Sequence, residues 1–193
     1  MRWSAALLAS FVVTALAPAP ARAQGYFSPN VGYDFGGDAG NCPSLFNDCS
    51  EKRTSYGLTA GFLSGGIFGI EEDLAYAPDF FGQSASLGSN SVLTLMTNLV
   101  VGIPAGPVRP YVSAGIGLIR TNVNFTPSAL LSFSNSNFGY DIGGGVMVFF
   151  PHHLGVRGDF RHLHSAQDIS ILGISLPSTK LNFTRASIGL VLH

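Results

Sequence analysis

The residues of this sequence that could carry chemistry are carboxylates and arginines that recur on one face of alternating segments. They are Glu71, Asp73, Asp141, Arg157, Asp159, Arg161 and Arg185. Two neighbouring carboxylates can act as a general acid and a general base. No nucleophile motif, glycine-rich phosphate loop or metal signature accompanies them in the sequence, so we expect no catalytic residue, cofactor or metal ion. The planar fork of arginine suits pairing with carboxylates, which favours a structural network of ion pairs.

Two pairs of histidines are the remaining candidates, because imidazole is a common metal ligand. His162 and His164 fall on one face of an alternating segment, and His152 is followed directly by His153. Neither pair has the further ligands that a closed metal site needs, so solvated or interfacial side chains are expected.

The composition limits the kind of molecule that can position these residues. Charged residues make up 11% of the 193-residue chain, against roughly 25% in ordinary soluble domains, and the mean hydropathy is +0.32. After the first 23 residues, the richest apolar run is 146–150, far below the roughly 20 residues of a transmembrane helix. A closed β-barrel is the other structure that can span a bilayer, and these properties favour it.

The start of the chain has the three parts of a cleavable export signal. A basic residue at Arg2 precedes the apolar stretch 5–17 and an A-x-A pattern at 21–23. We therefore expect a signal peptide at 1–23 and one barrel domain at 24–193; an uncleaved signal anchor is the alternative. Removing the two arginines of the signal from the 10 basic residues leaves 8 against 11 acidic ones, which excludes a basic nucleic-acid-binding surface.

The two cysteines lie close together in the sequence. Cys42 and Cys49 fall within one expected loop of an exported chain, where a disulfide is the usual outcome. A metal pair is the less favoured alternative, because two thiols do not complete a tetrahedral site and no histidine lies nearby.

Eight segments of alternating side chains, separated by clusters of Gly, Pro, Asn and Ser, indicate an all-β protein. The segments lie at 30–36, 54–63, 67–76, 91–103, 109–120, 138–150, 156–161 and 181–192. The expected long connections are 37–53, 77–90, 121–137 and 164–180, and the tight ones are 64–66, 104–107 and 151–152. An even number of strands with tight turns at one end and long loops at the other is typical of an outer-membrane barrel.

The predicted fold is therefore an eight-stranded antiparallel transmembrane β-barrel with an up-and-down meander. Its outward face is expected to be apolar, and small or polar residues, including Asn98 and the phenol of Tyr111, are expected to fill the narrow interior. A soluble lipocalin-like barrel would reverse these faces. The low charge disfavours that alternative, because Arg157, Asp159 and Arg161 would then stand on an otherwise weakly charged surface.

One residue conflicts with the alternation. Glu72 falls on the apolar face of the third segment, together with Phe68, Ile70 and Leu74. Either a β-bulge turns Glu72 inward or the residue lies near an interface where its carboxylate reaches water. We expect the interface.

Aromatic residues near strand ends are expected to form the girdles that mark the two membrane interfaces. They are Tyr26, Tyr33, Tyr56, Phe68, Tyr76, Phe138, Phe150 and Phe183.

Four segments resemble strands of the outer-membrane β-barrel domain shared by small porin-family and outer-membrane protein A-like proteins. They are 68–71, 109–117, 143–145 and 155–161. The resemblance covers residues 26 to 193 and implies a bacterial outer-membrane location, no cofactor and no peptidoglycan-binding domain. Members commonly end in an aromatic residue that the barrel-assembly machinery recognises, whereas this chain ends in His193.

These observations lead to two hypotheses of function and disfavour a third. The first is a structural or surface-interaction barrel, with four long loops facing outside and an extracellular ligand bound through them. The second is a narrow pore for water or small ions, gated by the interior ion pairs. An enzyme acting on lipid is not expected, since no matching His-and-Ser constellation is present in the sequence. The expected partners are outer-membrane lipid and, during biogenesis, the barrel-assembly machinery.

Overall fold

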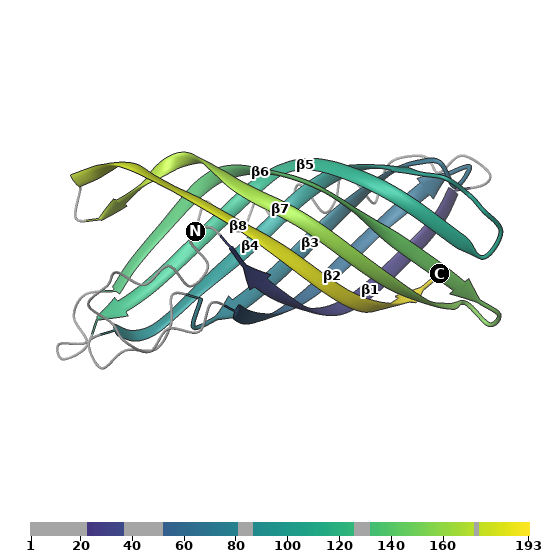
Figure 1. The fold of residues 1–193 in the computed structure, drawn as a ribbon, viewed down its shortest axis with the longest axis horizontal. Helices are drawn as coiled ribbons and strands as arrows, with labels where there is room; N and C mark the ends of the chain where they lie inside the picture. The colour runs from purple at the N-terminus through teal and green to yellow at the C-terminus, as the bar shows by residue number, and fades with distance from the viewer. Residues whose placement is uncertain (1–22, 37–51, 81–86, 126–131, 172–173) are drawn as a thin grey trace, which may run out of the picture.

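The computed structural model describes residues 23–36, 52–80, 87–125, 132–171 and 174–193. These residues form a closed barrel in which each strand pairs antiparallel with the next and the last pairs with the first (Figure 1). The strands are β1 (Ala23–Phe35), β2 (Lys52–Ser64), β3 (Phe68–Pro78), β4 (Leu87–Gly102), β5 (Val108–Phe125), β6 (Ser132–Phe150), β7 (Leu154–Ile171) and β8 (Ile174–Leu192). The predicted eight-stranded antiparallel meander is confirmed. No helix within the described ranges is long and apolar enough to cross a membrane.

The alternation of the sequence becomes an alternation of burial in the strands. On β3 the side chains of Glu71, Asp73 and Ala75 are buried inside the barrel, while Leu74 and Tyr76 are exposed on the outside. Large apolar residues dominate the exposed face on the other strands as well, with Leu99 at 66% and Ile116 at 65% exposure. This arrangement is the reverse of a soluble lipocalin-like barrel.

The two ends of the barrel differ in their connections. Tight turns use positive backbone φ angles at Gly65, Gly66 and Gly106, and at His152 and His153. The first and last strands begin and finish at this same end, which we call the turn end. The opposite end carries the connections around 37–51, 81–86, 126–131 and 172–173, and we call it the loop end.

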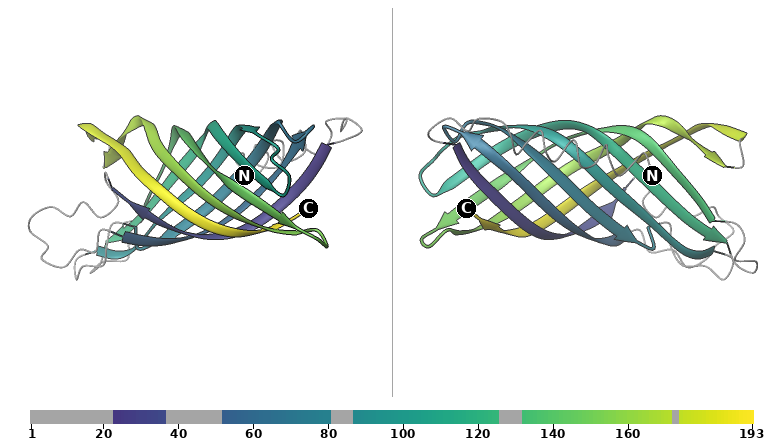
Figure 2. Two further views of the ribbon diagram at one scale, coloured as in Figure 1. Left: turned by 45° about the vertical axis from the view of Figure 1, so that its right-hand side comes forward. Right: turned by 180° about the vertical axis from the view of Figure 1, so that it is seen from behind.

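The strands run further toward the loop end than the sequence predicted. The expected long connection 164–180 is largely strand, because β7 continues to Ile171 and β8 starts at Ile174. In the residues that follow Ser165 on β7 and those that precede Thr184 on β8, the two strands pair only with each other in the described structure. Figures 1 and 2 show the hairpin projecting beyond its neighbours. Polar residues in this stretch had favoured a loop.

The interior holds two apolar clusters separated by polar side chains. The loop-end plug consists of Ala77, Phe80, Val92, Met96, Ile119, Leu163, Leu181 and Phe183. The turn-end plug consists of Tyr26, Leu63, Val100, Tyr111, Met147 and Val191, with Phe149 packed against it. The expectation of a wholly small and polar interior is therefore wrong near both ends. On β4 the order along the strand is Met96 in one plug, then Asn98, then Val100 in the other.

Candidate functional site

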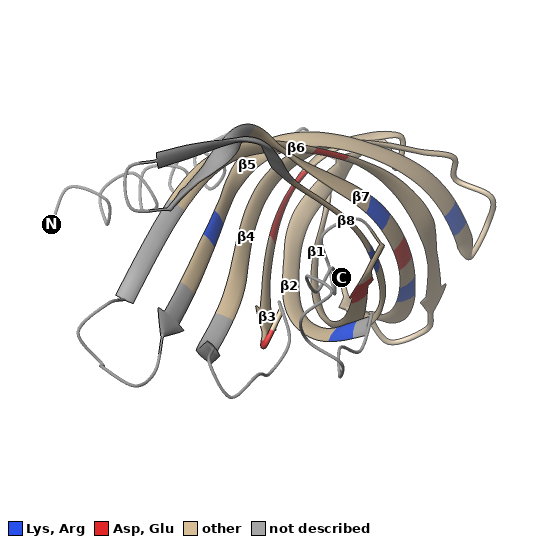
Figure 3. Cartoon of the chain, turned by 60° about the vertical axis from the view of Figure 1, so that its left-hand side comes forward, with Lys and Arg blue, Asp and Glu red and all other residues tan. Residues whose placement is uncertain are grey.

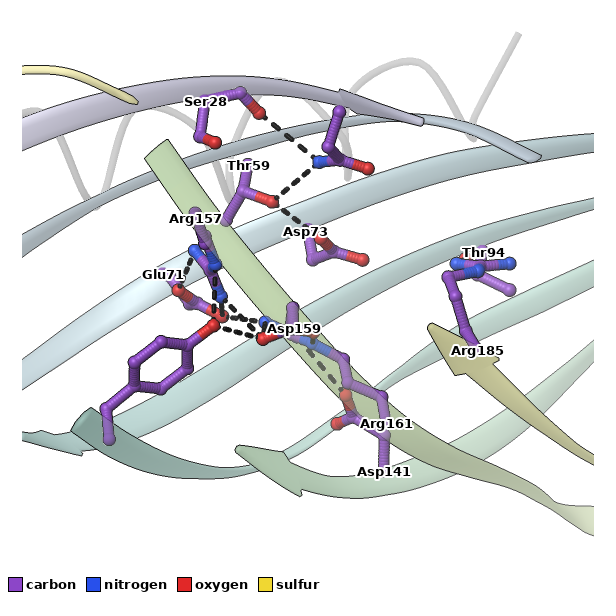
Figure 4. Close-up of polar contacts among 12 residues, drawn as sticks. Ser28, Thr59, Glu71, Asp73, Thr94, Asp141, Arg157, Asp159, Arg161 and Arg185 are labelled. Atoms are coloured by element: carbon purple, nitrogen blue, oxygen red, sulfur yellow. Dashed lines mark hydrogen bonds and ion pairs between the residues drawn. The ribbon is translucent and has the colours of Figure 1, made fainter. Parts of the chain in front are cut away.

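The polar layer between the plugs is centred on Glu71 of β3. Its carboxylate accepts two hydrogen bonds from Arg157, one from Nη1 at 2.9 Å and one from Nη2 at 3.1 Å. It also pairs with Arg161 (Figure 4), and it accepts a hydrogen bond from the hydroxyl of Tyr26. Both carboxylate oxygens of this fully buried residue are thus used, by side chains from β1 and β7.

Asp159 joins the two arginines of its own strand. Arg157 Nη2 lies 3.1 Å from Asp159 Oδ2, and the guanidinium of Arg161 contacts the other oxygen. Residues two apart on a strand share one face, so β7 directs all three charged side chains into the lumen. Figure 3 shows the three positions as blue, red and blue bands along β7. The hydroxyl of Tyr111 on β5 donates to Asp159 and accepts from Arg157 Nε at 2.7 Å.

Two further acids lie at the edge of this layer. Arg161 Nη1 is 3.3 Å from Asp141 Oδ2 on β6. Asp73 accepts a hydrogen bond of 2.7 Å from the hydroxyl of Thr59, which itself accepts one of 3.2 Å from Asn30. We call Glu71, Asp73, Asp141, Arg157, Asp159 and Arg161, with the phenols of Tyr26 and Tyr111, the ion layer.

A separate ion pair joins the first strand to the last. Arg185 on β8 contacts both oxygens of Asp34 on β1, at 2.6 Å from Nε and 3.1 Å from Nη2. Arg185 also donates to Thr94 at 3.0 Å, and Ser55 donates to Asp34 at 3.3 Å. Asp34 and Arg185 are register partners on β1 and β8, the two strands whose pairing closes the barrel. The ion pair therefore links these two strands.

The structure brings together most of the residues singled out in the sequence. Five of them are linked by ion pairs within the ion layer, Asp73 belongs to its edge through Thr59, and Arg185 forms a separate pair with Asp34. Tyr26 and Asp34 were not included in the expected network. Asp34 shares the inward parity of its segment, and extending that parity back along β1 would have placed Tyr26 inside as well.

The expected aromatic girdles are only partly correct. Six of the eight residues are exposed on the outside of the barrel, namely Tyr33, Tyr56, Phe68, Tyr76, Phe138 and Phe150. Tyr26 lies in the turn-end plug, and Phe183 lies in the loop-end plug with its ring 4.9 Å from that of Phe80. The parity of Phe183 with Arg185 was the signal that both side chains point inward.

Glu72 remains on the outer face of β3. The pairing of β3 with β2 and with β4 runs without a register shift, so no bulge turns Glu72 inward. Its carboxylate accepts a hydrogen bond from the hydroxyl of Thr97, with the two oxygens at 2.9 and 3.0 Å. Along β3, Glu72 lies midway between the exposed rings of Phe68 and Tyr76. Its position near a membrane interface stays a prediction.

The histidines occupy both ends of the barrel. His152 and His153 form the turn between β6 and β7, whereas His162 and His164 lie on the outer face of β7. In the part of the chain that the structure describes, no group of three or more His, Cys, Asp and Glu side chains is placed to hold a metal ion. Cys42, Cys49 and residues 1–22 lie outside the described residues.

Comparisons with known proteins agree with this architecture. The family model of the outer membrane protein beta-barrel domain matches residues 4–193. The 22 kDa outer membrane protein of Rhizobium leguminosarum bv. viciae is 25% identical over 142 residues, which cover 72% of this chain and 63% of that protein. The chain thus spans less than two thirds of the length of this relative.

Two solved structures share the fold. Neisserial surface protein A superposes with a TM-score of 0.65 at 14% identity, covering 88% of this chain and 97% of that one. Ail of Yersinia pestis, in complex with the heparin analogue sucrose octasulfate, gives a TM-score of 0.52 at 16% identity, covering 88% and 99%.

Proposed function

Because the chain belongs to the outer membrane protein beta-barrel domain family, we propose that it is a closed scaffold in the bacterial outer membrane that acts through its loop end. Barrels of this membrane place tight turns in the periplasm and longer connections outside, so the loop end faces the exterior. Residues 1–23 are removed on export in this proposal. The partners are outer-membrane lipid, the barrel-assembly machinery during insertion, and an extracellular ligand bound through the connections.

The observation that supports a scaffold is the filling of the lumen. Each plug contains fully buried side chains, such as Phe183 and Met96 at the loop end and Met147 at the turn end. Between them the two guanidiniums of the ion layer are tied to acids from three strands. Eight-stranded barrels have interiors just wide enough for side chains to fill, so a through-path requires several of these contacts to break at once.

Conductance of the refolded full chain in a planar lipid bilayer tests the closed lumen. We expect no current steps above those of the protein-free membrane. Discrete steps from the wild-type chain would contradict the scaffold.

Retention of cells on immobilised glycan and host-matrix surfaces tests the role of the loop end. Replacing 37–51, 81–86 and 126–131 by short turns should leave the barrel folded and remove retention, if those connections bind a ligand. Equal retention by cells with the intact and the shortened chain would contradict the surface-interaction role.

A narrow pore gated by the ion layer is the second candidate. It is favoured by one observation, namely that Arg161 contacts Glu71, Asp141 and Asp159 and so has alternative acids between which it can exchange. In that case Arg161→Gln should change both the size and the frequency of the current steps, while the lipid-facing Val112→Ala should not.

A further inference from the structure

The ion layer contains more carboxylates than guanidiniums. Its charged members are four acids and two arginines, namely Glu71, Asp73, Asp141, Asp159, Arg157 and Arg161. Arg185 does not compensate the excess, because it pairs with Asp34. Arg53 and Arg109, the other inward arginines of the described strands, lie near the ends of β2 and β5. Uncompensated buried charge is costly, so the excess favours the uptake of a proton by one of the acids.

Three of the four acids have contacts that suit the ionised form. Both oxygens of Glu71 accept hydrogen bonds from guanidiniums, and so do both oxygens of Asp159. Asp73 accepts a hydrogen bond from Thr59, whose hydroxyl oxygen accepts one from Asn30 and so has its hydrogen free for Asp73. Because all these contacts use carboxylate oxygens as acceptors, they favour the charged form of the three acids.

Asp141 differs from the other acids, because one of its carboxylate oxygens has no partner. Oδ2 lies 3.3 Å from Arg161 Nη1 (Figure 4), whereas Oδ1 is buried without a hydrogen bond to any described residue. Asn98 on β4 is fully buried, and within the same described ranges its amide oxygen accepts no hydrogen bond. Both atoms are acceptors, so a single hydrogen between them would satisfy both.

The strand register brings these two side chains together. Gly115 on β5 is the register partner of Asn98 on one side and of Asp141 on the other. A Cβ built on Gly115 would overlap Asn98 Oδ1, so the amide oxygen occupies the space that a side chain at this position would fill. No side chain of β5 therefore separates the amide of Asn98 from the carboxyl group of Asp141 at this level.

We propose that Asp141 holds a proton in the folded barrel and donates it from Oδ1 to the amide oxygen of Asn98. The proton comes from water when the chain folds, since an aspartate of the unfolded chain is ionised at neutral pH. Oδ2 of the neutral carboxyl group still accepts from Arg161. Release of the proton at high pH would give Arg161 a third ionised partner beside Glu71 and Asp159. The proton thus determines how the charge of Arg161 is shared.

The titratable and charged side chains that share the ion layer with Asp141 come from four strands. They are Tyr26 on β1, Glu71 and Asp73 on β3, Tyr111 on β5, and Arg157, Asp159 and Arg161 on β7. The three carboxylates oppose a further negative charge, and the two guanidiniums favour one. Both guanidiniums already contact Glu71 and Asp159, so less of their charge remains for Asp141. The two phenols donate to Glu71 and Asp159 and add no charge.

Urea titrations of the refolded full chain in detergent micelles, at about pH 5 and about pH 8, test the proposal. A folded state that holds a proton which the unfolded state releases loses stability as the pH rises, so the wild-type midpoint should fall between these values. Asp141→Asn supplies an amide N–H in place of the proton. Its midpoint should fall less and should equal or exceed that of the wild type at the higher pH. The matched control is Asp159→Asn, the same change at an acid with two guanidinium partners, whose midpoint should be below that of the wild type at both values.

Infrared spectroscopy detects the proton itself. The carbonyl stretch of a protonated carboxyl group should lose intensity in Asp141→Asn, and the same component of the wild-type band should disappear as the pH is raised. Asn98→Ala, which removes the acceptor, should shift that component. Equal band intensity in the wild type and Asp141→Asn, or a wild-type band that does not change with pH, would overturn the proposal. A midpoint of Asp141→Asn as low as that of Asp159→Asn at the higher pH would identify Asp141 as an ionised partner of Arg161 and overturn it as well.

Discussion

Glu71 contacts two guanidiniums and a phenol. Its removal therefore affects more interior contacts than the removal of an acid with a single partner. Glu71→Gln leaves Arg157 and Arg161 buried with one negative charge fewer. Removing one partner of a buried ion pair typically costs about 3 to 5 kcal/mol. We expect a loss of that size in the free energy of unfolding, measured by urea titration in detergent micelles.

The adjacent residue provides the control. Glu72→Gln changes the same functional group one position along β3, on the outer face, where its partner is the hydroxyl of Thr97. We expect its unfolding midpoint to stay close to that of the wild type. Similar losses for Glu71→Gln and Glu72→Gln would contradict the structural role of the ion layer.

Glu72 itself should be replaceable by an apolar residue. The carboxylate lies midway along the lipid-facing side of β3, and lipid exposure of an acid costs less than the roughly 2 to 4 kcal/mol of an arginine. Glu72→Leu should therefore leave stability unchanged or raise it slightly in the same titration. A loss of several kcal/mol would show that Glu72 has an inward partner and that the register of β3 is different.

Sequence parity identified most of the ion layer, but it could not identify which acid meets which guanidinium. Arg157 and Glu71 lie on β7 and β3, strands that do not pair with each other, and their contact crosses the lumen. Such contacts depend on the tilt and stagger of the closed sheet, which one strand does not reveal. Tyr26 and Phe183 were misplaced because their position near a strand end was given more weight than their parity.

At the scale of strands, glycines on β5 and β6 make room for side chains that cross the lumen. A Cβ built on Gly145 of β6 would approach the backbone oxygen of Gly158 and the hydroxyl of Tyr111 too closely. Gly158 on β7, in contrast, has nothing within 4 Å of such a Cβ.

These two glycines give a matched pair of variants. Gly145→Ala should destabilise the barrel by about 1 to 3 kcal/mol, because Tyr111 and the neighbouring backbone must move. Gly158→Ala should change stability by no more than about 0.5 kcal/mol. Thermal unfolding followed by circular dichroism measures both, and equal effects would contradict the packing of Tyr111 over Gly145.

The disulfide between Cys42 and Cys49 stays a prediction, since both cysteines lie outside the described residues. The bond would close a short loop, so it should stabilise the barrel by no more than about 2 to 3 kcal/mol. We expect intact-mass analysis of the native protein, after alkylation without reduction, to find no modified thiol. Two alkylated cysteines would show that the bond is absent. Cys42→Ser should still fold.

The lengths of β7 and β8 could have been read more accurately from the sequence. Ile169, Ile171, Ile174 and Leu176 continue the alternation through the supposed long loop. Ser, Pro and Gly in the same stretch signalled turns, and those signals were given precedence. Turn residues and solvent-exposed strand residues have overlapping compositions, so composition alone does not set the boundary of a strand outside the membrane.

For the whole molecule, the proposed closed scaffold means that the two plugs and the ion layer act as barriers in series. Phe183→Ala removes a large side chain from the loop-end plug, and Met147→Ala removes one from the turn-end plug. Each variant retains the other plug and the ion layer. Neither variant should conduct in a planar bilayer. Current steps from either single variant would show that one plug alone closes the lumen.

The architecture itself was predictable because it depends on features that each segment displays locally. Strand number, the alternation of tight and long connections, and the apolar outer face all follow from period-two patterns and turn residues. The apolar plugs were not foreseen. Met96 and Leu163 share the inward parity of neighbouring polar residues, and only the closed barrel shows that such side chains from different strands meet.

The pair formed by Asp34 and Arg185 bears on the order in which the barrel assembles. The two residues are 151 positions apart in the chain, and Arg185 belongs to the last strand of the barrel. An isolated hairpin of β7 and β8 would carry Arg157, Arg161 and Arg185 into hydrocarbon with only Asp159 beside them. Stepwise insertion of hairpins is therefore unfavourable, and the first and last strands must meet before the arginines leave water.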